Sequence, residues 1–158
     1  SHWGYNLKIT EMQGAIGCAQ VNKIDEFGKR RRYNWERLKN GMKDLEKYFI
    51  LPKPTENSDP SWFGFMITIR DKRINRLDLL KYLEEKNIQT RLLFAGNITR
   101  QPLFDHMNKD QDYRVIGDLK NTNIITEDSF WIGVYPKMND DMIDYMIECI
   151  RSYVNLIE

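Results

Sequence analysis

The sequence is poor in the residues that metal sites and disulfide frameworks require, with two cysteines and two histidines in the whole chain. Such a set does not make a convincing four-ligand zinc site. Cys18 and Cys149 each lie in an apolar helical pattern. We therefore expect two buried free thiols, which is typical of proteins in a reducing compartment such as the cytoplasm.

Long apolar runs and a strong charge imbalance are also missing. No run approaches the roughly 20 apolar residues of a membrane-spanning helix, and no basic-then-apolar signal segment opens the chain. The formal net charge is +1, which argues against a protein whose main partner is a nucleic-acid backbone. With 158 residues, of which 41% are apolar, we expect one globular domain with neither a membrane nor a nucleic acid as its partner.

The catalytic motifs that a single sequence can reveal are absent as well. There is no phosphate-binding P-loop, no G-x-G-x-x-G dinucleotide fingerprint and no G-x-S-x-G nucleophile elbow. The acidic residues are scattered, and His106 lies in a polar stretch typical of an exposed side chain. The sequence therefore predicts no self-contained active site, and its polar groups could instead complete a site on another domain.

What the sequence does contain is a clear helical pattern at its N-terminal end. Thr10 and Gln13 form a capping-box signature, and apolar residues then recur at helical spacing as far as Leu45. Small residues at 14–19 predict close approach of another element, and Gly28 and Gly41 allow a bend or break. The basic run 29–32 is interpreted as a solvated segment of this helix.

The rest of the chain alternates between strand and helix patterns. The run 62–69 is almost continuously apolar, which predicts a strand covered on both faces. Two more strands are expected at 89–94 and 130–136, and capped helices after Asn75 and Asn139. Residues 95–129 are expected to be irregular. The order predicts an α/β domain with a long N-terminal helix and a three-stranded sheet covered by helices.

The stretch RLLFAGNITRQP, residues 91–102, concentrates hydrogen-bond donors. Arg91, Asn97, Thr99, Arg100 and Gln101 supply two guanidiniums, two carboxamides and a hydroxyl, with no acid among them. Guanidinium groups match phosphate oxygens, and amides bind hydroxyls. The stretch is therefore either an anion or sugar site, or a polar surface loop.

Several stretches resemble a known family. GYNLKITEMQGAIGCAQV resembles the segment that follows the cofactor domain in sugar aminotransferases of the DegT/DnrJ/StrS type. SDPSWFGFMITI, QTRLLFAGNITRQPLF and SFWIGVYP resemble more specifically its CDP-4-dehydro-6-deoxyglucose 3-dehydrase branch, which makes 3,6-dideoxyhexoses for lipopolysaccharide. The resemblance covers nearly the whole chain in order. It implies that residues 1–158 are the small C-terminal domain of a type I aminotransferase fold, with the cofactor domain upstream.

The resemblance also implies a cofactor, partners and chemistry. The full-length protein would be a homodimer that uses pyridoxal or pyridoxamine 5'-phosphate (PLP or PMP) to remove the C3 hydroxyl of a CDP-4-keto-6-deoxy sugar. The residues that hold the cofactor ring and the cysteines for a [2Fe-2S] cluster would lie upstream, and a reductase partner would supply electrons. An ordinary PLP sugar aminotransferase remains an alternative, as does a stand-alone nucleic-acid-binding module. The residue at the upstream lysine position, histidine in the dehydrase branch, distinguishes the first two.

Site residues follow from the same resemblance. Asn6 matches the asparagine that reaches the cofactor phosphate of the neighbouring subunit, although it could simply be a turn residue. Phe63 stands where the aminotransferases usually have histidine, which favours dehydration, although it could be a core aromatic. Arg91, Asn97 and Arg100 lie where the family's strand and loop approach the nucleotide-sugar. We expect them to face its diphosphate.

Overall fold

The structure is a computed structural model that describes residue 5 and residues 7–158. Its helices are α1 (Glu11–Val21), α2 (Ile24–Gly41), α3 (Arg76–Glu85), α4 (Lys120–Asp128) and α5 (Asp140–Ile157). Its strands are β1 (Phe49–Ile50), β2 (Gly64–Ile69), β3 (Thr90–Arg91) and β4 (Ser129–Gly133). Short 3-10 turns occupy Lys43–Leu45, Ile98–Arg100 and Pro102–His106. No helix in the described part of the chain is long and apolar enough to cross a membrane.

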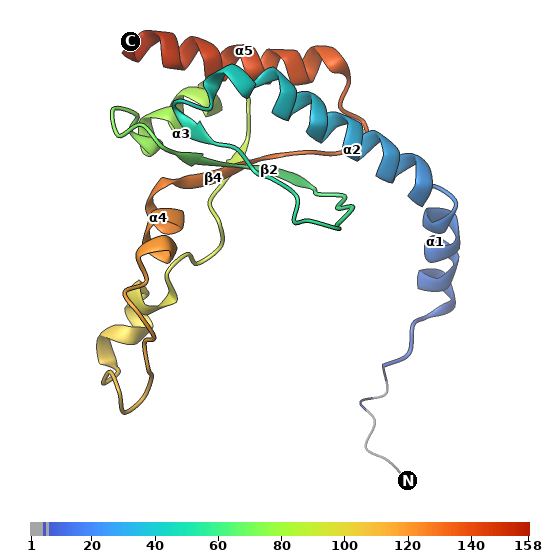
Figure 1. The fold of residues 1–158 in the computed structure, drawn as a ribbon. Helices are drawn as coiled ribbons and strands as arrows, with labels where there is room; N and C mark the ends of the chain where they lie inside the picture. Colours follow the sequence, from blue (N-terminus) through green and yellow to red (C-terminus); the bar gives the residue numbers. More distant parts are fainter. Residues whose placement is uncertain (1–4, 6) are drawn as a thin grey trace.

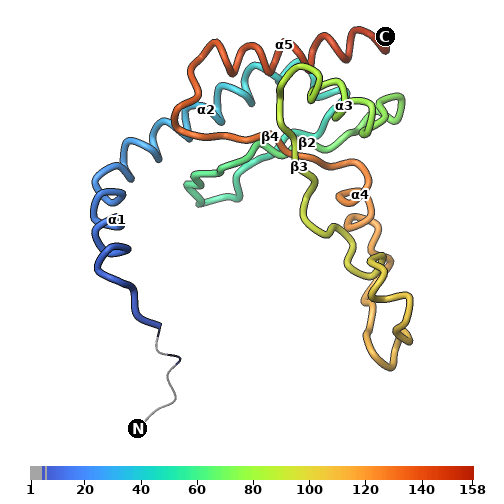
Figure 2. The backbone as a smooth tube through the Cα atoms, turned by 180° about the vertical axis from the view of Figure 1, so that it is seen from behind, coloured from blue at the N-terminus to red at the C-terminus, as the bar shows by residue number. Residues whose placement is uncertain are grey.

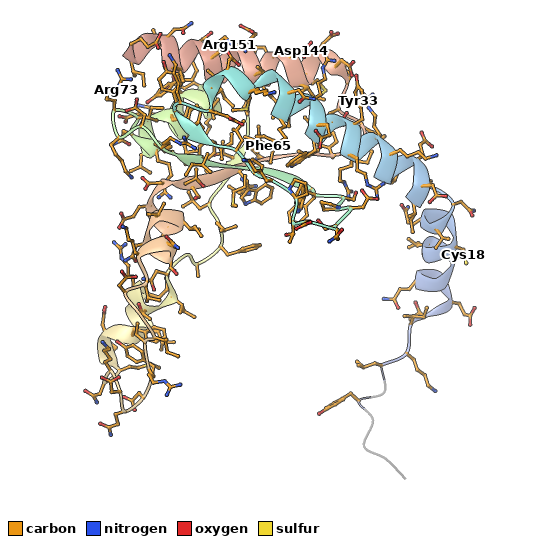
Figure 3. The ribbon with its side chains drawn as sticks, viewed as in Figure 1. Cys18, Tyr33, Phe65, Arg73, Asp144 and Arg151 are labelled. Carbon is orange, nitrogen blue, oxygen red and sulfur yellow. The ribbon has the colours of Figure 1, made fainter. Side chains whose placement is uncertain are left out.

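The sheet is antiparallel throughout, with the strand order β1-β2-β4-β3. The helices α2, α3 and α5 lie together on one side of it (Figure 1). On that face the cross-strand pairs Phe65–Ile132 and Ile67–Phe130 are completely buried. Phe65 lies in the layer between β2 and the helices (Figure 3). The expected α/β domain is therefore confirmed, with a core that its own sheet and helices close.

That core draws on α2, α3, α5, β1, β2 and β4. Its largest fully buried side chains are Phe49, Phe65, Phe130, Leu38, Met42, Ile67, Leu79, Leu83, Ile132, Ile143, Ile150 and Val134. Cys149 is buried beside them in α5, as the sequence predicted. Gly41, the last residue of α2, lies against α5: a Cβ there would lie 2.3 Å from Cδ1 of Ile147.

The opposite face of the sheet is only partly covered, so the prediction of a strand covered on both faces is wrong. α4 contacts β2 and β4 at one end of this face, where Thr68 and Ser129 are buried and share a hydrogen bond of 2.7 Å. At the other end, Gly64, Met66 and Trp131 are only half-buried. Two arms, α1 and the segment that leads to α4, extend beyond the sheet on this open side (Figures 1 and 2).

The N-terminal helix differs from the prediction in two ways. The capping box at Thr10 and Gln13 is confirmed, but the helix breaks at Asn22 and Lys23 instead of Gly28. α1 buries none of its residues against the described chain, so the expected burial of Cys18 is also wrong. Figure 3 shows Cys18 on α1, away from the sandwich. The close partner that its small residues predict is not found within the described residues.

The sheet has four strands instead of the three expected, because the two-residue β1 is too short to leave a sequence pattern. β3 is shorter than predicted, since the chain turns away through Phe94 and Gly96, both with positive φ (45° and 60°). α4 lies in the stretch expected to be irregular. It starts after Leu119, which makes no side-chain cap; Asp118, one residue earlier, accepts from the backbone N of Lys120 (3.0 Å).

The interpretation of the basic run 29–32 as a solvated segment is wrong for its three arginines, which are half-buried and bonded within the chain. Arg30 binds the Met138 carbonyl oxygen (Nη2–O, 2.9 Å) and Asp140 (2.9 Å). Arg31 donates to the Ser61 carbonyl oxygen, and Arg32 pairs with Asp59. These pairings argue against the nucleic-acid-binding module, which would need the same guanidiniums free for phosphates.

Further contacts join α2 to α5, and those at Asp140 lower the pKa of its carboxyl. The Tyr33 hydroxyl donates to Asp140 (2.8 Å), and Arg37 pairs with Asp144 (2.7 Å); Figure 3 shows Tyr33 on α2 and Asp144 on α5. The hydrogen bond from Tyr33, followed by Arg30 and Arg37, holds the pKa of Asp140 below its usual range. These groups are largely exposed, so they tie the helices together without contributing to the core.

We expect acid to weaken the fold through the contacts of Asp140. A carboxyl whose pKa is lower in the folded than in the unfolded state stabilises the fold fully above its unfolded pKa, about 3.9 for aspartate. That contribution is lost as the pH falls through the folded value. The free energy of unfolding should therefore fall below about pH 4, and the Asp140→Asn variant should show a shallower fall when urea unfolding is followed across this range. Glu56→Gln, which removes an exposed loop carboxylate, serves as the control. An unchanged slope in Asp140→Asn would contradict the assignment.

Candidate functional site

The half-open end of the sheet is organised around Trp131 of β4. Its cross-strand neighbours are Met66 on β2 and Arg91 on β3. The ring of Phe63 meets the indole edge to face, with centroids 5.4 Å apart and an interplanar angle of 86°. A Cβ at Gly64 would lie 2.6 Å from Cε3 of Trp131, so glycine is needed for the indole to lie across β2. Phe63, Arg91 and Trp131 are called the Trp131 patch below.

Two of the residues predicted for the site are thus brought together on either side of an aromatic ring. The side chain of Phe63 is 62% exposed, so it is not a core aromatic. Arg91 is exposed, and its Nη1 donates to the Thr90 carbonyl oxygen (3.0 Å). No salt bridge to Arg91 is found within the described chain. Its charge is therefore available to an anion.

Beside the Trp131 patch lies a cleft of about 680 Å³ between the β3–β4 edge and α5. Its walls include Arg91, Trp131 and Gly133 from the sheet, and Tyr135, Met142 and Tyr145 from the turn and helix that follow. Lys86 also lines the cleft, with its Nζ over the ring of Tyr82 (5.6 Å to the centroid), and the described residues of the lining include neither Asp nor Glu. The cleft therefore combines aromatic and thioether surface with positive charge.

The turn that carries Tyr135 and Met138, which forms one wall of the cleft, is held in place by side chains of α2. Asn34, fully buried in α2, donates from Nδ2 to the carbonyl oxygen of Tyr135 (2.8 Å), and Arg30 holds Met138 in the same turn. The Tyr145 hydroxyl donates to the Lys86 carbonyl oxygen (3.2 Å). A side-chain interaction with Cys149, followed by burial, raises the pKa of Tyr145 above its usual value. The wall is therefore preformed, and its phenol is neutral at physiological pH.

Asn97 and Arg100 lie on the arm that leads to α4 and do not line the cleft. Asn97 is 4% exposed; its Nδ2 donates to Asn123 (2.7 Å), and its Oδ1 accepts from the backbone N of Thr99 (3.0 Å). Arg100 is exposed and pairs with Glu127 of α4 (2.5 Å). The structure thus gives Asn97 a role in holding the loop on α4. The contacts of Asn97 and Arg100 with a substrate stay predictions.

The remaining predicted residue, Asn6, lies outside the described residues. Conversely, sequence reasoning missed Trp131, Tyr135 and Tyr145. The alternation in FWIGVYP, residues 130–136, was a usable signal, because it places positions 131 and 133 on the face opposite Phe130 and Ile132. Tyr145 joins them only through the packing of α5, which no local pattern reveals.

The arrangement is suited to binding and orienting a ligand. Within the described residues, no three His, Cys, Asp or Glu side chains gather into a metal site. The Trp131 patch and the cleft supply a free guanidinium, aromatic faces and neutral hydrogen-bonding groups. They contain no carboxylate that could act as a general base. The chemistry that they support is recognition of a flat, anionic molecule.

The chain is similar to proteins of deoxysugar biosynthesis. The model of the DegT/DnrJ/EryC1/StrS aminotransferase family matches residues 1–151. The lipopolysaccharide biosynthesis protein RfbH of Salmonella typhimurium is 46% identical, over 99% of this chain and 35% of its own length. The dTDP-4-dehydro-2,6-dideoxy-D-glucose 3-dehydratase of Saccharopolyspora spinosa is 49% identical, over 98% of this chain and 32% of its own. The chain thus spans about a third of these curated relatives.

Solved structures show the same fold. The GDP-4-keto-6-deoxy-D-mannose-3-dehydratase of E. coli, with bound hydrated PLP, superposes with a TM-score of 0.79 at 30% identity, over 92% of this chain and 36% of that one. The aminotransferase from Psychrobacter cryohalolentis superposes with a TM-score of 0.83 at 18% identity, over 99% of this chain and 42% of that one. The second likeness concerns the fold alone.

Proposed function

Because this chain belongs to the DegT/DnrJ/EryC1/StrS aminotransferase family, we propose that it is the C-terminal small domain of a nucleotide-sugar 3-dehydrase of lipopolysaccharide biosynthesis. The observation that carries this proposal is identity of 46% and 49%, over nearly the whole chain, to RfbH and to a sugar 3-dehydratase. We propose CDP-4-keto-6-deoxyglucose as the substrate. The Trp131 patch supports this proposal, since a free guanidinium beside aromatic rings suits a nucleotide-sugar.

The exposed apolar surface supports the proposal that residues 1–158 are one domain of a longer protein. α1 is apolar yet exposed, and a helix of that kind usually packs against another element. Its exposed side chains include Met12, Ile16 and Val21. The open face of the sheet lies between α1 and the α4 arm (Figure 1). We propose that the cofactor domain covers both surfaces.

In this proposal a bound PLP or PMP supplies the electron sink for loss of the C3 hydroxyl. No carboxylate among the described residues lines the cleft to pair with the cofactor's ring nitrogen. We propose that residues upstream hold the ring and that this chain forms the surface facing the ring and its sugar. Arg91 would bind the diphosphate and so hold the sugar in a fixed position relative to the cofactor. Phe63 cannot carry a proton. It would exclude water at the position where the aminotransferases usually have a histidine, a residue that could take part in proton transfer.

The other partners belong to the same proposal. We propose a homodimer, a reductase that supplies electrons, and a [2Fe-2S] cluster held by residues outside this chain. Cys149 is buried in α5, whereas Cys18 is exposed on α1, and neither belongs to a cluster of metal-binding side chains among the described residues. The cytoplasmic location expected from the sequence stays a prediction.

The test of this site is Arg91→Ala in the full-length protein. We expect the Michaelis constant for the CDP-sugar to rise about tenfold or more, since hydrogen bonds to charged groups contribute roughly 1.5–3 kcal/mol. Arg73→Ala is the matched control, because Arg73 is also exposed but pairs with Asp71 in the turn before α3 (Figure 3). Equal Michaelis constants for the two variants would show that Arg91 does not bind the CDP-sugar. The Michaelis constant of Arg100→Ala, measured in the same assay, tests whether Arg100 also contacts the CDP-sugar.

Asn6 remains the proposed contact with the cofactor phosphate of the neighbouring subunit. Its carboxamide can donate to a phosphate oxygen without adding charge. Asn6→Ala should therefore weaken cofactor retention in the full-length dimer while leaving dimerisation intact. Mixing this variant with a subunit defective in the cofactor domain should restore activity at one of the two shared sites. Heterodimers that form but stay inactive would show that Asn6 does not act across the dimer.

A further inference from the structure

The turn that follows β3 holds a large aromatic side chain out of the protein. Phe94 is 84% exposed and has a positive φ of 45°, a conformation that phenylalanine adopts only where the surrounding structure fixes it. Its backbone N donates to the Leu92 carbonyl oxygen (2.9 Å), and that of Gly96 to the Leu93 carbonyl oxygen (3.0 Å). Neither the strain nor the exposed ring stabilises this domain, which indicates a function for the side chain.

The turn is anchored to α4 by a polar cluster. The backbone N of Asn97 donates to the Thr126 hydroxyl (2.7 Å), and its Nδ2 donates to Asn123 (2.7 Å). Gly96 lies against the same threonine, since a Cβ there would be 2.7 Å from Thr126 Oγ1. Arg76 of α3 donates to the Thr126 carbonyl oxygen (2.6 Å), which ties this end of α4 to the sandwich. Gly96, Asn97, Asn123 and Thr126 are called the α4 anchor below.

The other end of the turn is bound to the Trp131 patch. Trp131 Nε1 donates to the carbonyl oxygen of Leu92 (3.3 Å), the residue after Arg91. The segment LLFAG, residues 92–96, has no polar side chain. The free guanidinium of Arg91 is thus followed at once by an apolar segment that is held at both ends. This segment lies where the chain leaves β3 for the α4 arm, on the open side of the sheet (Figure 2).

We propose that Phe94 contacts the C6 methyl group of the substrate's sugar and so selects 6-deoxysugars. The proposal rests on the proposed function, in which Arg91 binds the diphosphate. Because the sugar is bonded to that diphosphate, it lies beside Arg91, within reach of the apolar segment. The C6 methyl is the one apolar substituent of a 4-keto-6-deoxyhexose, and its burial against an aromatic ring is favourable. A C6 hydroxyl in the same place would lose its water without gaining a partner.

The α4 anchor has a positioning role in this proposal. It holds the ring of Phe94 in a fixed place relative to the guanidinium of Arg91, so that one substrate meets both groups. The hydroxyl of Thr126 is central, because it accepts from the backbone of Asn97 and itself donates to the Thr122 carbonyl oxygen (2.7 Å).

Two nucleotide-sugars that differ only at C6 test the contact. CDP-6-deoxyglucose carries a methyl group there and CDP-glucose a hydroxymethyl group, and neither has the 4-keto group that the reaction needs. We would measure both dissociation constants by calorimetry with the full-length protein. We expect the wild type to bind the deoxysugar about fourfold more tightly, the effect of one buried methyl group. Phe94→Ala should abolish this preference, and Phe94→Leu, which keeps an apolar side chain, should retain most of it.

Leu77→Ala is the matched control, because Leu77 is also exposed but lies on α3, on the covered side of the sheet (Figure 1). It should leave the preference unchanged. Phe94 is almost fully exposed, so its replacement leaves the core intact. Equal binding of the two sugars by the wild type, or a preference that Phe94→Ala does not alter, would overturn the proposal.

The α4 anchor is tested with two variants of Thr126. Thr126→Val removes the hydroxyl that binds Asn97 and should weaken the preference for the deoxysugar, whereas Thr126→Ser keeps the hydroxyl and should retain the preference. A general loss of stability would not change the ratio of the two dissociation constants. The same ratio in both variants would overturn the positioning role of the anchor.

These outcomes are separable from the proposed function. A preference that Phe94→Ala abolishes, in a full-length protein that shows no dehydrase activity, supports the contact and contradicts the dehydrase. Dehydrase activity together with a preference that Phe94→Ala leaves intact contradicts only the contact.

Discussion

Replacing Phe130 by alanine should lower the free energy of unfolding by about 3–5 kcal/mol, the usual cost of removing a buried phenylalanine. Phe130 is completely buried in β4, opposite Ile67 of β2 and beneath the helical layer. Removing its ring leaves a cavity that the antiparallel ladder on either side cannot close. Urea unfolding of the isolated chain, followed by circular dichroism, measures the loss.

Phe63→Ala is the control, since Phe63 belongs to the same sheet region but is 62% exposed. Its loss should cost about 1 kcal/mol, the order of the edge-to-face contact with Trp131. Losses of similar size in the two variants would contradict the division of the sheet into a buried and an open face.

The second large effect concerns the isolated chain, which should have no dehydrase activity at all. The chain spans about a third of its curated relatives, and its described residues hold no carboxylate in the cleft and no metal-binding cluster. Because the residues proposed to hold the cofactor ring lie upstream, the chain should also bind PLP or PMP weakly. The purified chain would be dialysed after incubation with excess cofactor, and its absorption spectrum recorded. A stoichiometric cofactor band, or turnover of the CDP-sugar, would show that the site is complete within this chain.

The sequence predicts well what local chemistry decides. The caps at Thr10, Asn75 and Asn139 and the apolar stripe of α5 are confirmed, because a cap or a helical face is decided within a few residues. The cross-strand register that exposes one face of β2 depends on β4, which follows more than 60 residues later. Continuous apolar sequence could therefore not distinguish a strand with two covered faces from one whose second face awaits a partner.

The site shows the same division. Phe63 and Arg91 were predicted from the family resemblance, and the structure brings them to one aromatic ring. Trp131 was missed although the alternation in its strand places it on the face opposite Phe130, and Tyr145 was missed because it lies on a helix whose apolar stripe faces the core. Asn97 was predicted as a substrate contact from the same resemblance; in this chain its amide is bonded to Asn123 and Thr99, and the substrate contact stays a prediction. Which donors stay free for a ligand is decided by tertiary contacts, such as those of α4, that no local pattern reveals.

The central claim is that this domain serves a dehydrase that removes the C3 hydroxyl of a CDP-sugar. The most direct measurement supplies the full-length protein with PMP, a source of electrons and CDP-4-keto-6-deoxyglucose, and determines the product by mass spectrometry and NMR at C3. A parallel reaction contains PLP and glutamate as an amino donor. We predict a sugar that has lost the oxygen at C3 and has gained no nitrogen at C4. A product that keeps its C3 hydroxyl and carries a 4-amino group would contradict the account and identify an aminotransferase.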